Sequence, residues 1–582
     1  MSPRYFQDEM LYLRDLARDF ALHHPALAPL LAERSTDPDV ERLLEGVAFL
    51  TARVRERIDA GQGEMVHALC SLLAPSLLRP TPSCAVLELL PAPSALRERV
   101  TSPAGTEYAS VPVDGIECRF ASAWPVELVP WVAEGLRLES SPAGGQVLRL
   151  SLRGPANVGL AAHAPERFRL FVDADPRTQT TLLLWLSEHL ADVVLEDAET
   201  ARPFLSLGRG AVSLPGFEDG AALLPEGDDH ALGFSLLREL SVLPEKLAFV
   251  DVTGLRRLAS IDKSPSRVVL AFHFRSPLPP ELRLEPGVLK LHCVPVVNVF
   301  QTGAVPLSIT PQRQEYALRP EGLTPSQGDV FAVTAVTGIL KSGARVPVTP
   351  FYSYQTADRT RGTRTYVVHQ RPSNVGEGTE TSVSFWRPKD EPPVDLDVVS
   401  IELLATNRSL PQALRAGDIR VATQSSPPFA SFRNLRSPSA YVPARLAGDL
   451  HWRLVAHAGL GLGSLARVPA LRSLVAIEDP RADVDAQAGR ARDLRVASIR
   501  EVVQRPEERV YRGSLVRGVA IEVTLDDRGF AGAGEAFVFG GILDRLFASA
   551  APINVFTRTT VTLTPSNERF SWPARAGGRP LL

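Results

Sequence analysis

Only a few acidic and histidine side chains in this sequence of 582 residues have a spacing that suggests chemistry. Asp228, Asp229 and His230 are of types that bind divalent metals, but a metal site needs a further ligand from elsewhere, and neighbours on a polar segment usually face solvent. Asp251 stands in the apolar run 249–254, on a strand of the kind that can present a catalytic carboxylate. Because the sequence shows no partner for it, we favour a structural hydrogen bond for Asp251 over catalysis.

Motifs that would hold phosphates, nucleophiles or metal ions are absent from the sequence. It contains no Walker motif, nucleophile elbow, HExxH pair, EF-hand loop or paired CxxC. The glycines of segment 459–463 have the wrong spacing for a dinucleotide site and predict an ordinary loop. Arg359, Arg361 and Arg364 indicate a solvated hairpin tip, for which an acidic protein surface is a more plausible target than nucleic acid. We predict no catalytic, cofactor-binding or metal-binding residue, and no enzymatic activity.

Composition and charge indicate a globular chain that stays in the cytoplasm. The net charge is −3, with 45% apolar and 22% charged residues, so no whole-chain field would attract nucleic acid or an anionic membrane. The four cysteines lack a paired spacing, which predicts buried, reduced thiols. Asp8 and Glu9 interrupt the segment where a signal peptide would be apolar, and no apolar run approaches the ~18 residues of a membrane span. We expect neither nucleic-acid binding nor direct membrane insertion.

Residues 1–80 are predicted to form amphipathic helices. In the first helix, apolar residues recur at a spacing of four, three, four and three, at Phe6, Met10, Leu13, Ala17 and Phe20. The second helix has Asp37 as its predicted N-cap and Pro38 at its first position, and its apolar stripe includes Val40, Leu44 and Val47. Packing of the helices on each other or on the next domain would cover these stripes, and the alternative is a helical bundle with another chain. These eight apolar residues are the candidate partner interface.

Beyond residue 80 the hydrophobic period changes from that of a helix to that of a strand. Short alternating runs separated by turns stand at 147–152, 167–172, 282–285 and 289–297. One helix is predicted among them, at 178–195. This pattern favours antiparallel sandwich-like or barrel-like domains over a doubly wound parallel sheet. The C-terminal part is predicted to contain a helix at 451–477, a strand at 519–526 and a helix at 534–550.

The predicted fold class is α+β and multidomain, with N-terminal amphipathic helices, a β-rich antiparallel middle and an α+β C-terminal domain. A dense group of prolines and charges marks a linker at 387–396. The predicted domains are 1–80 (helical), 81–240 (β-rich with one inserted helix), 241–386 (second β-rich domain) and 397–582 (α+β).

Long motifs follow one another in a fixed order along the chain, at 4–16, 37–53, 244–252 (PEKLAFVDV), 293–300 (CVPVVNVF) and 530–582. They resemble the motifs of the TssF family, also known as VasA or ImpG, of bacterial type VI secretion systems. The resemblance spans essentially the whole chain. It departs from the family pattern at 59–64, where an acidic aromatic segment is usual, and at 74–76, where Tyr-Pro-His is frequent.

The resemblance implies a structural wedge subunit of the type VI baseplate. In that family two TssF copies join one TssG, with helices of the three chains in a shared bundle. The wedges ring the VgrG hub, carry TssE and the base of the TssB/TssC sheath, and connect through TssK to the membrane complex. The expected partners are therefore a TssG-like subunit, a second copy of this chain, TssK, TssE, VgrG and TssB/TssC. The expected location is cytoplasmic, docked at the inner membrane through the machine, without a cofactor.

Two other functions remain open on the sequence alone. A homologous subunit of a phage tail or another contractile injection device would carry similar motifs. A glycan-active enzyme or binding module on a β-sandwich would use Asp228, Asp229 or Asp251, because glycoside hydrolysis needs two carboxylates about 5–10 Å apart across a cleft. A deep cleft with converging acids would favour that function, and acids scattered over convex surfaces would exclude it.

Overall fold

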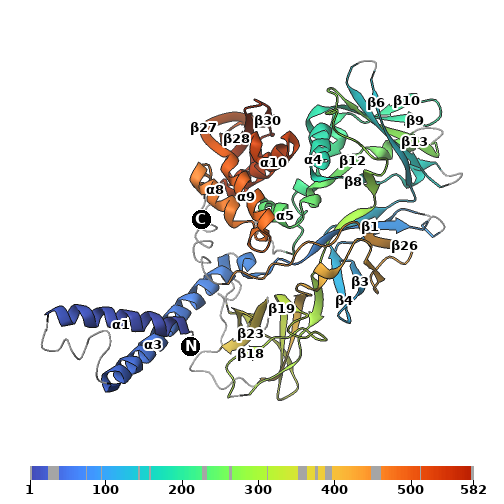
Figure 1. The fold of residues 1–582 in the computed structure, drawn as a ribbon. Helices are drawn as coiled ribbons and strands as arrows, with labels where there is room; N and C mark the ends of the chain where they lie inside the picture. Colours follow the sequence, from blue (N-terminus) through green and yellow to red (C-terminus); the bar gives the residue numbers. More distant parts are fainter. Residues whose placement is uncertain are drawn as a thin grey trace. The chain divides into compact units, whose positions relative to one another are not determined.

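The protein, here a computed structural model, forms two compact units. The first comprises Met1–Leu78, Tyr352–Tyr354 and Leu446–Ala458, and the second comprises Arg79–Phe351, Gln355–Arg445 and Gly459–Leu582. Figure 1 shows the elements of each unit. The structure describes residues 3–578 apart from 24–37, 74, 93–94, 97, 142–143, 156–158, 226–231, 261–264, 311, 352–363, 374–377, 387–395, 447–460 and 512.

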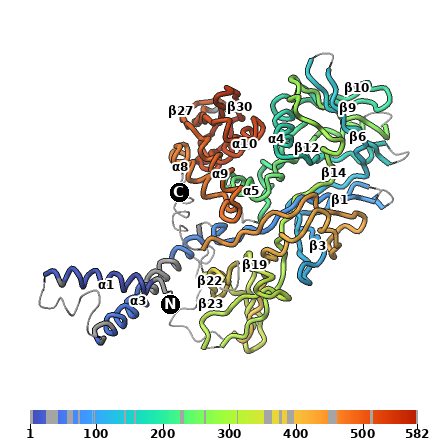
Figure 2. Tube along the Cα trace, viewed as in Figure 1, coloured from blue at the N-terminus to red at the C-terminus, as the bar shows by residue number. Residues whose placement is uncertain are grey.

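The first unit is built on a pair of helices. Helix α1 spans Pro3–His23 and α3 spans Pro38–Leu73, and the short helix η1 follows at Pro75–Leu78. The two long helices pack against each other (Figures 1 and 2). The predicted helical character of residues 1–80 is confirmed for the described part. Helix α3 begins at Pro38, whose fixed φ suits the first turn, and the predicted N-cap Asp37 lies outside the described residues.

An antiparallel sheet of six strands in the second unit curls until its terminal strands lie close together. Its strands are, in sheet order, β25 (Ile419–Ala422), β3 (Glu107–Val113), β4 (Ile116–Ser122), β15 (Cys293–Val297), β1 (Cys84–Pro91) and β26 (Ala430–Asn434). Asn434 links the two terminal strands, because its Oδ1 accepts a hydrogen bond from the Ile419 backbone N at 2.9 Å. The prediction of a barrel-like antiparallel middle is confirmed here.

Two further antiparallel sheets and a small strand pair continue the β-rich middle. One has the order β10 (Pro203–Ser206), β9 (Leu190–Asp197), β13 (Arg267–Phe274), β7 (Gln146–Arg153) and β6 (Val132–Ser140). The other has the order β11 (Val212–Ser213), β12 (Phe249–Thr253), β8 (Arg167–Val172) and β14 (Leu289–Leu291). The pair is β2 (Val100–Ser102) with β5 (Val126–Leu128). Strands β7 and β8 confirm the alternating runs predicted at 147–152 and 167–172.

Two assignments made from the sequence are wrong. The helix predicted at 178–195 ends early: α4 spans Pro176–Leu184, a π-helical turn follows at Trp185–His189, and the chain then enters β9. Strand β9 pairs with β13 along its length, and this non-local pairing overrides the helical spacing of its leucines and valines. The strand predicted at 282–285 is irregular, since Pro279, Pro280 and Pro286 flank it and prolines interrupt strand pairing.

Two small sheets share a separate hydrophobic cluster around Val383, Val399 and Ile401. The first contains β16 (Phe300–Gly303), β17 (Leu307–Ser308), β24 (Leu396–Thr406), β19 (Asp329–Leu340) and β20 (Arg345–Pro347). The second contains β18 (Tyr316–Ala317), β23 (Thr379–Trp386), β22 (Thr365–Pro372) and β21 (Thr349–Pro350). Residues 387–395 of the predicted linker lie outside the described residues. Buried Asn298, which follows β15, donates from Nδ2 to Asn407 Oδ1 at 2.8 Å and so ties the end of β24 to the six-stranded sheet.

The C-terminal part is α+β, as predicted. Strands β27 (Ile499–Tyr511) and β28 (Ser514–Asp526) form a hairpin, and β29 (Phe556–Thr564) lies parallel to β28 with β30 (Arg569–Ser571) and β31 (Arg575–Ala576) beside it. Parallel neighbours need a crossover, which α10 (Ala533–Ala550) supplies. The other helices are α7 (Leu462–Leu465), α8 (Val468–Ile477) and α9 (Ala486–Ser498). The strand predicted at 519–526 and the helix at 534–550 are confirmed, whereas 451–460 of the helix predicted at 451–477 lie outside the described residues.

Helix α10 packs backbone to backbone between α4 and α5 (Leu232–Val242). A Cβ added at Gly233 of α5 would lie 2.2 Å from Leu546 Cα, and one at Gly534 of α10 would lie 2.4 Å from the Thr180 carbonyl carbon of α4. Only glycine fits such distances.

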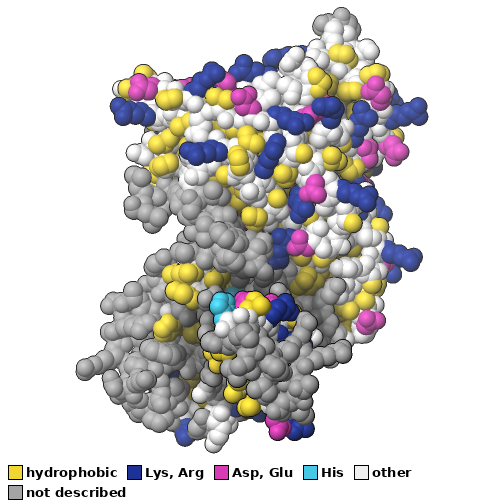
Figure 3. All heavy atoms as spheres, turned by 60° about the vertical axis from the view of Figure 1, so that its left-hand side comes forward, with side chains coloured by type: hydrophobic (Ala, Val, Ile, Leu, Met, Phe, Trp, Pro, Cys, Tyr) yellow, Lys and Arg dark blue, Asp and Glu magenta, His cyan; other side chains and the backbone are white. Residues whose placement is uncertain are grey.

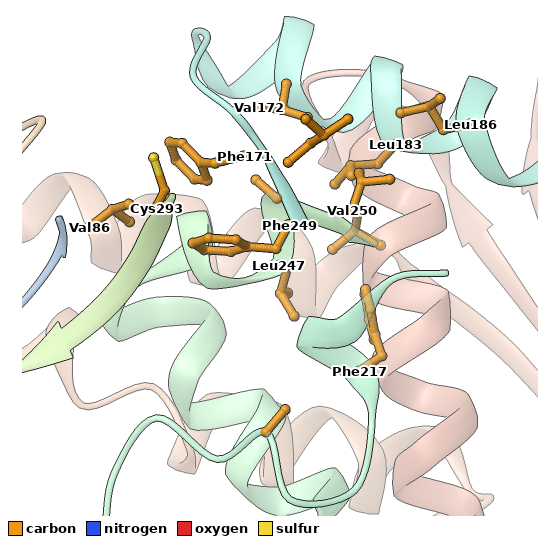
Figure 4. Close-up of a cluster of buried hydrophobic side chains, with 14 of the residues drawn as sticks. Val86, Phe171, Val172, Leu183, Leu186, Phe217, Leu247, Phe249, Val250 and Cys293 are labelled. Carbon is orange, nitrogen blue, oxygen red and sulfur yellow. The ribbon is translucent and has the colours of Figure 1, made fainter. Parts of the chain in front are cut away.

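In the core of the same unit, Phe171 and Phe249 lie with ring centroids 4.9 Å apart, and Figure 4 shows Phe217 beside the pale red C-terminal helix.

Candidate partner interface on the N-terminal helices

Most apolar side chains of α3 fall on two neighbouring arcs that differ in exposure, and Phe49, 45% exposed, lies outside both. Ala48, Ala52 and Cys70 have no exposed surface. On the other arc stand six exposed apolar residues, Leu43, Val47, Leu50, Val54, Met65 and Leu69. With 3.6 residues per turn, these six fall within about 100° of the helix circumference. We call them the α3 stripe.

Helix α1 turns most of its predicted residues toward α3. Phe6, Met10, Leu13 and Ala17 are half-buried. Glu9 lies on the same arc, and its Oε1 is 2.9 Å from Arg55 Nη1 of α3. The four-and-three spacing on α1 therefore lies on the side that faces α3, and the role of these residues in a partner interface stays a prediction.

The remaining candidate residues are divided between the buried and exposed sides. Phe20 is 46% exposed and Val47 is 44% exposed, whereas Leu44 is half-buried. The side chain of Val40 lies outside the described residues. Beside the α1–α3 contact, α1 exposes four more large apolar side chains, Leu11, Tyr12, Leu16 and Leu22. The surface available to a partner is thus the α3 stripe together with the outer apolar residues of α1.

The surface extends beyond the residues predicted as the interface, by Leu43, Leu50, Val54, Met65 and Leu69. The sequence carries a signal for Leu50 and Val54, because the spacing of four and three continues after Val47. Covering one such side chain fully stabilises a complex by roughly 1.5–3 kcal/mol before entropy losses. Large apolar side chains exposed in a row along one helix are typical of an interaction site.

The charges around this surface contribute little to its stability. Arg18 Nη1 lies 3.7 Å from Asp15 Oδ1, and Arg42 Nη1 lies 3.6 Å from Asp39 Oδ1, with all four side chains more than half exposed. Such exposed pairs are worth about 0–1 kcal/mol. The surface is therefore apolar with a charged rim, which suits a protein partner. On the face that Figure 3 shows, Lys and Arg side chains stand among acidic and apolar ones instead of forming one patch.

The residues considered for chemistry are structural or undescribed. Asp251 is fully buried, and both its carboxylate oxygens accept hydrogen bonds from Arg169, Nε to Oδ1 at 2.8 Å and Nη2 to Oδ2 at 2.9 Å. Its predicted structural role is confirmed. Segment 228–230, Arg359, Arg361 and the first two residues of the glycine segment 459–463 lie outside the described residues. Arg364 precedes β22, and its carbonyl accepts a hydrogen bond from Thr349 N at 3.0 Å.

Neither a metal site nor a membrane-spanning helix is found among the described residues. No group of three or more His, Cys, Asp or Glu side chains in the described part of the chain is placed to hold a metal ion. Among the same residues, no helix is both long and apolar enough to span a bilayer. All four cysteines are buried.

Known proteins share this sequence and fold over nearly its whole length. The family described as "Type VI secretion system, TssF" matches residues 2–579. The type VI secretion system component TssF1 of Pseudomonas aeruginosa is 28% identical over 633 aligned residues, covering 100% of both chains. A chain in the cryo-electron microscopy structure of the type VI secretion system TssK-TssF-TssG baseplate subcomplex has a TM-score of 0.79 at 29% identity, covering 93% of this chain and 99% of that chain. A chain of the type VI baseplate complex has a TM-score of 0.65 at 28% identity, covering 99% and 100%. With its sequence matched from end to end and its fold shared, this chain belongs to the TssF family of type VI secretion systems.

Proposed function

We propose that this chain is a structural wedge subunit of a type VI secretion baseplate, which binds a TssG-like subunit through the α3 stripe and the outer apolar residues of α1. One observation carries the proposal: a long helix leaves six large apolar side chains exposed on a single arc. A free chain gains nothing from this exposure, whereas a helical bundle with another chain would cover it. One similar solved chain comes from a TssK-TssF-TssG baseplate subcomplex and another from a type VI baseplate complex, which supports the choice of partner.

The wider assembly is part of the proposal. A second copy of this chain would share the bundle, TssK would link the wedge to the membrane complex, and TssE, the VgrG hub and the TssB/TssC sheath would be carried by the ring of wedges. The chain would then work on the cytoplasmic side, docked at the inner membrane through the machine. Family membership supports these contacts, and none of them requires turnover or a cofactor.

The proposal includes no enzymatic activity. The glycan-active alternative relied on Asp228, Asp229 or Asp251, and of these only Asp251 lies among the described residues. Arg169 holds Asp251 in the interior, where no substrate reaches it. Glycoside hydrolysis needs a pair of carboxylates facing each other across a cleft, and Asp251 cannot supply one of them.

Co-expression with a TssG-like subunit tests the proposed interface. The double variant Leu43→Asp/Leu50→Asp places two charges in the α3 stripe, and we expect at least a tenfold loss of co-purified partner. The matched control is Val484→Asp/Leu494→Asp, which changes two apolar residues of similar exposure near and on α9 in the second unit. The proposed interface is wrong if the stripe variant retains its partner at the wild-type yield, or if the control loses it equally.

A further inference from the structure

A cleft with a volume of about 1060 Å³ lies in the second unit, between the four-stranded sheet and the C-terminal part. One wall consists of β11 and the short helix η5 (Pro215–Phe217), with residues that follow it. The other wall consists of α10 and the chain segment 571–578. Because its walls come from segments more than 300 residues apart, no pattern in the sequence indicated this cleft.

Both walls carry edges of β-sheets. Strand β11 is the terminal strand of its four-stranded sheet, and β30 is the terminal strand of the C-terminal sheet. Val212, Ser213 and Ser571 of these two strands line the cleft. A terminal strand has backbone N–H and C=O groups on one side that no neighbouring strand pairs with, and an extended peptide can add to it by main-chain hydrogen bonds.

The basic side chains of the cleft are already engaged within the chain. Arg575 and Arg545 both contact the Asp544 carboxylate, Arg545 with its Nη1 3.4 Å from Oδ2. Arg545 also donates from Nε to the Phe217 carbonyl at 3.3 Å. Burial, together with neighbouring Arg575, lowers the pKa of Arg545 to about 10, which still leaves its guanidinium charged at neutral pH.

The acidic side chains are less fully engaged. Glu218 pairs with Arg167, with Oε2 and Nη1 2.9 Å apart. Glu188 and Asp219 line the cleft, and neither makes an ion pair with any other described residue. The lining carries three carboxylates, those of Glu188, Glu218 and Asp219, and two guanidinium groups, those of Arg545 and Arg575. Its charge is therefore negative, which favours a basic ligand.

Aromatic side chains complete the lining. Phe537 and Trp572 stack with centroids 5.6 Å apart and an interplanar angle of 23°, and Phe217 and Trp572 both approach Gly541 of α10. All three rings are buried, so they hold the lining in place and leave contact with a ligand to the exposed side chains around them.

We propose that this cleft binds an extended, basic segment of another chain of the baseplate. The segment adds as a strand to the edge of β11, and its lysine or arginine side chains pair with Glu188 and Asp219. That the bound segment belongs to a baseplate chain rests on the proposed function. That the cleft binds a basic, extended peptide rests on the structure of the cleft alone.

Peptide binding to the full-length chain tests the cleft directly. The probes are two fluorescein-labelled heptapeptides, one alternating lysine with valine and one alternating glutamate with valine, followed by fluorescence anisotropy. We expect the lysine peptide to bind at least tenfold more tightly than the glutamate peptide, and Glu188→Lys/Asp219→Lys to remove that difference. The control Glu281→Lys/Glu285→Lys makes the same charge change at exposed residues outside the lining and should leave it intact. Equal affinity for both peptides, or equal loss in the control, would overturn the inference.

Photo-cross-linking in the assembled complex identifies the occupant. A photoreactive side chain replaces Ala574, an exposed residue of the lining, in the chain co-expressed with its baseplate partners. We expect a cross-link to a segment rich in lysine or arginine in another chain, which Glu188→Lys/Asp219→Lys reduces at least fivefold. A complex that forms without such a cross-link overturns the basic-segment inference and leaves the proposed function standing. If no complex forms, the proposed function fails and the peptide titration still decides on the cleft.

Discussion

The two units of this chain place their side chains in opposite ways. The N-terminal helix pair leaves large apolar residues such as Leu50, 62% exposed, on its surface. The second unit takes charges into its interior, where the side chains of Lys246 and Glu239 pair at 0% and 2% exposure. A charge in the interior is tolerated only when an opposite charge pairs with it. Apolar side chains exposed in a row are unfavourable in water, and a partner that covers them removes this unfavourable free energy. The contrast shows that the second unit stabilises its buried charges by pairing them within the chain, whereas the helix pair leaves a row of large apolar side chains in contact with solvent.

The motif PEKLAFVDV shows what the charges of the second unit do. Each of its charged residues pairs with a different element of that unit, in the pairs Glu245–Arg436, Lys246–Glu239 and Asp251–Arg169. These pairs connect the start of β12 to α5, to β8 and to the segment after β26. The motif is thus a structural junction.

The largest effect should come from breaking a buried pair. Lys246→Met leaves the Glu239 carboxylate buried without its cation, and we expect the free energy of unfolding to fall by about 3–5 kcal/mol. The double variant Lys246→Met/Glu239→Gln should recover most of this loss, because the amide oxygen can still accept the hydrogen bond from Leu223 N. Urea unfolding of the full chain measures both. A loss below about 1 kcal/mol in the single variant would show that the pair is not essential to the second unit.

The next largest effect on stability should come from lowering the pH, through protonation of His292. Burial of His292 lowers its pKa to about 4, and its Nε2 accepts a hydrogen bond from Val129 N at 3.2 Å in the neutral form. The unfolded chain, with an ordinary histidine pKa of about 6.5, binds the proton more readily. Stability should therefore fall as pH drops from about 6.5 to 4, by about 3 kcal/mol in all.

Comparison with His292→Asn isolates this histidine from other titrating groups. Asparagine tolerates the left-handed backbone at position 292, where φ is 54°. The free energy of unfolding is measured for the wild type and the variant at pH 7 and at pH 4.5, and the loss between the two pH values is compared. If the variant loses as much stability as the wild type over this range, His292 is not the group responsible.

Glycine substitutions should act with opposite signs in the two units. Gly534→Ala forces α10 away from α4, and we expect a loss of about 1–3 kcal/mol. Gly46→Ala changes a glycine of α3 with no atom within 4 Å of the added Cβ, and the higher helix propensity of alanine should stabilise the helix by up to about 1 kcal/mol. Thermal unfolding of each variant measures the shift. A destabilising Gly46→Ala would mean that this side of α3 is more crowded than the structure shows.

The smallest effect should come from the α3 stripe of the free chain. Leu50→Ser removes an exposed side chain, so we expect the free energy of unfolding to stay within about 0.5 kcal/mol of the wild type. Urea unfolding of the chain without partner is the measurement. A larger loss would indicate that Leu50 packs within this chain and is not reserved for another.

Local patterns predicted the local elements. The alternation at 147–152 and 167–172 became β7 and β8, and the run at 534–550 became α10, because their burial faces follow the period of the sequence. Strand partners could not be predicted. Strand β1 pairs with β15 and β26, which follow it by about two hundred and more than three hundred residues, and alternation says nothing about which strand lies alongside. The boundaries at 240 and 386 stay a prediction, and cuts there would separate strands of this one sheet.

The candidate interface was predicted only in part for a similar reason. Amphipathic spacing reveals an apolar arc but not what covers it, so the α1 residues that contact α3 and the α3 residues that face outward have the same signature. Only the structure separates Leu13, which is half-buried, from Leu50, which is exposed. The cleft had no signature at all, because its lining is assembled by tertiary contacts.

Thiol labelling at the α3 stripe tests the central claim most directly. The four native cysteines are buried, so Leu50→Cys introduces a thiol that should react with a maleimide far faster than they do. Leu494→Cys, at a residue 59% exposed on α9, is the matched control. We expect binding of the TssG-like subunit to slow maleimide labelling of the Leu50→Cys chain at least tenfold. The labelling rate of the Leu494→Cys chain should not change. Equal labelling of Leu50→Cys with and without the bound subunit would contradict the claim.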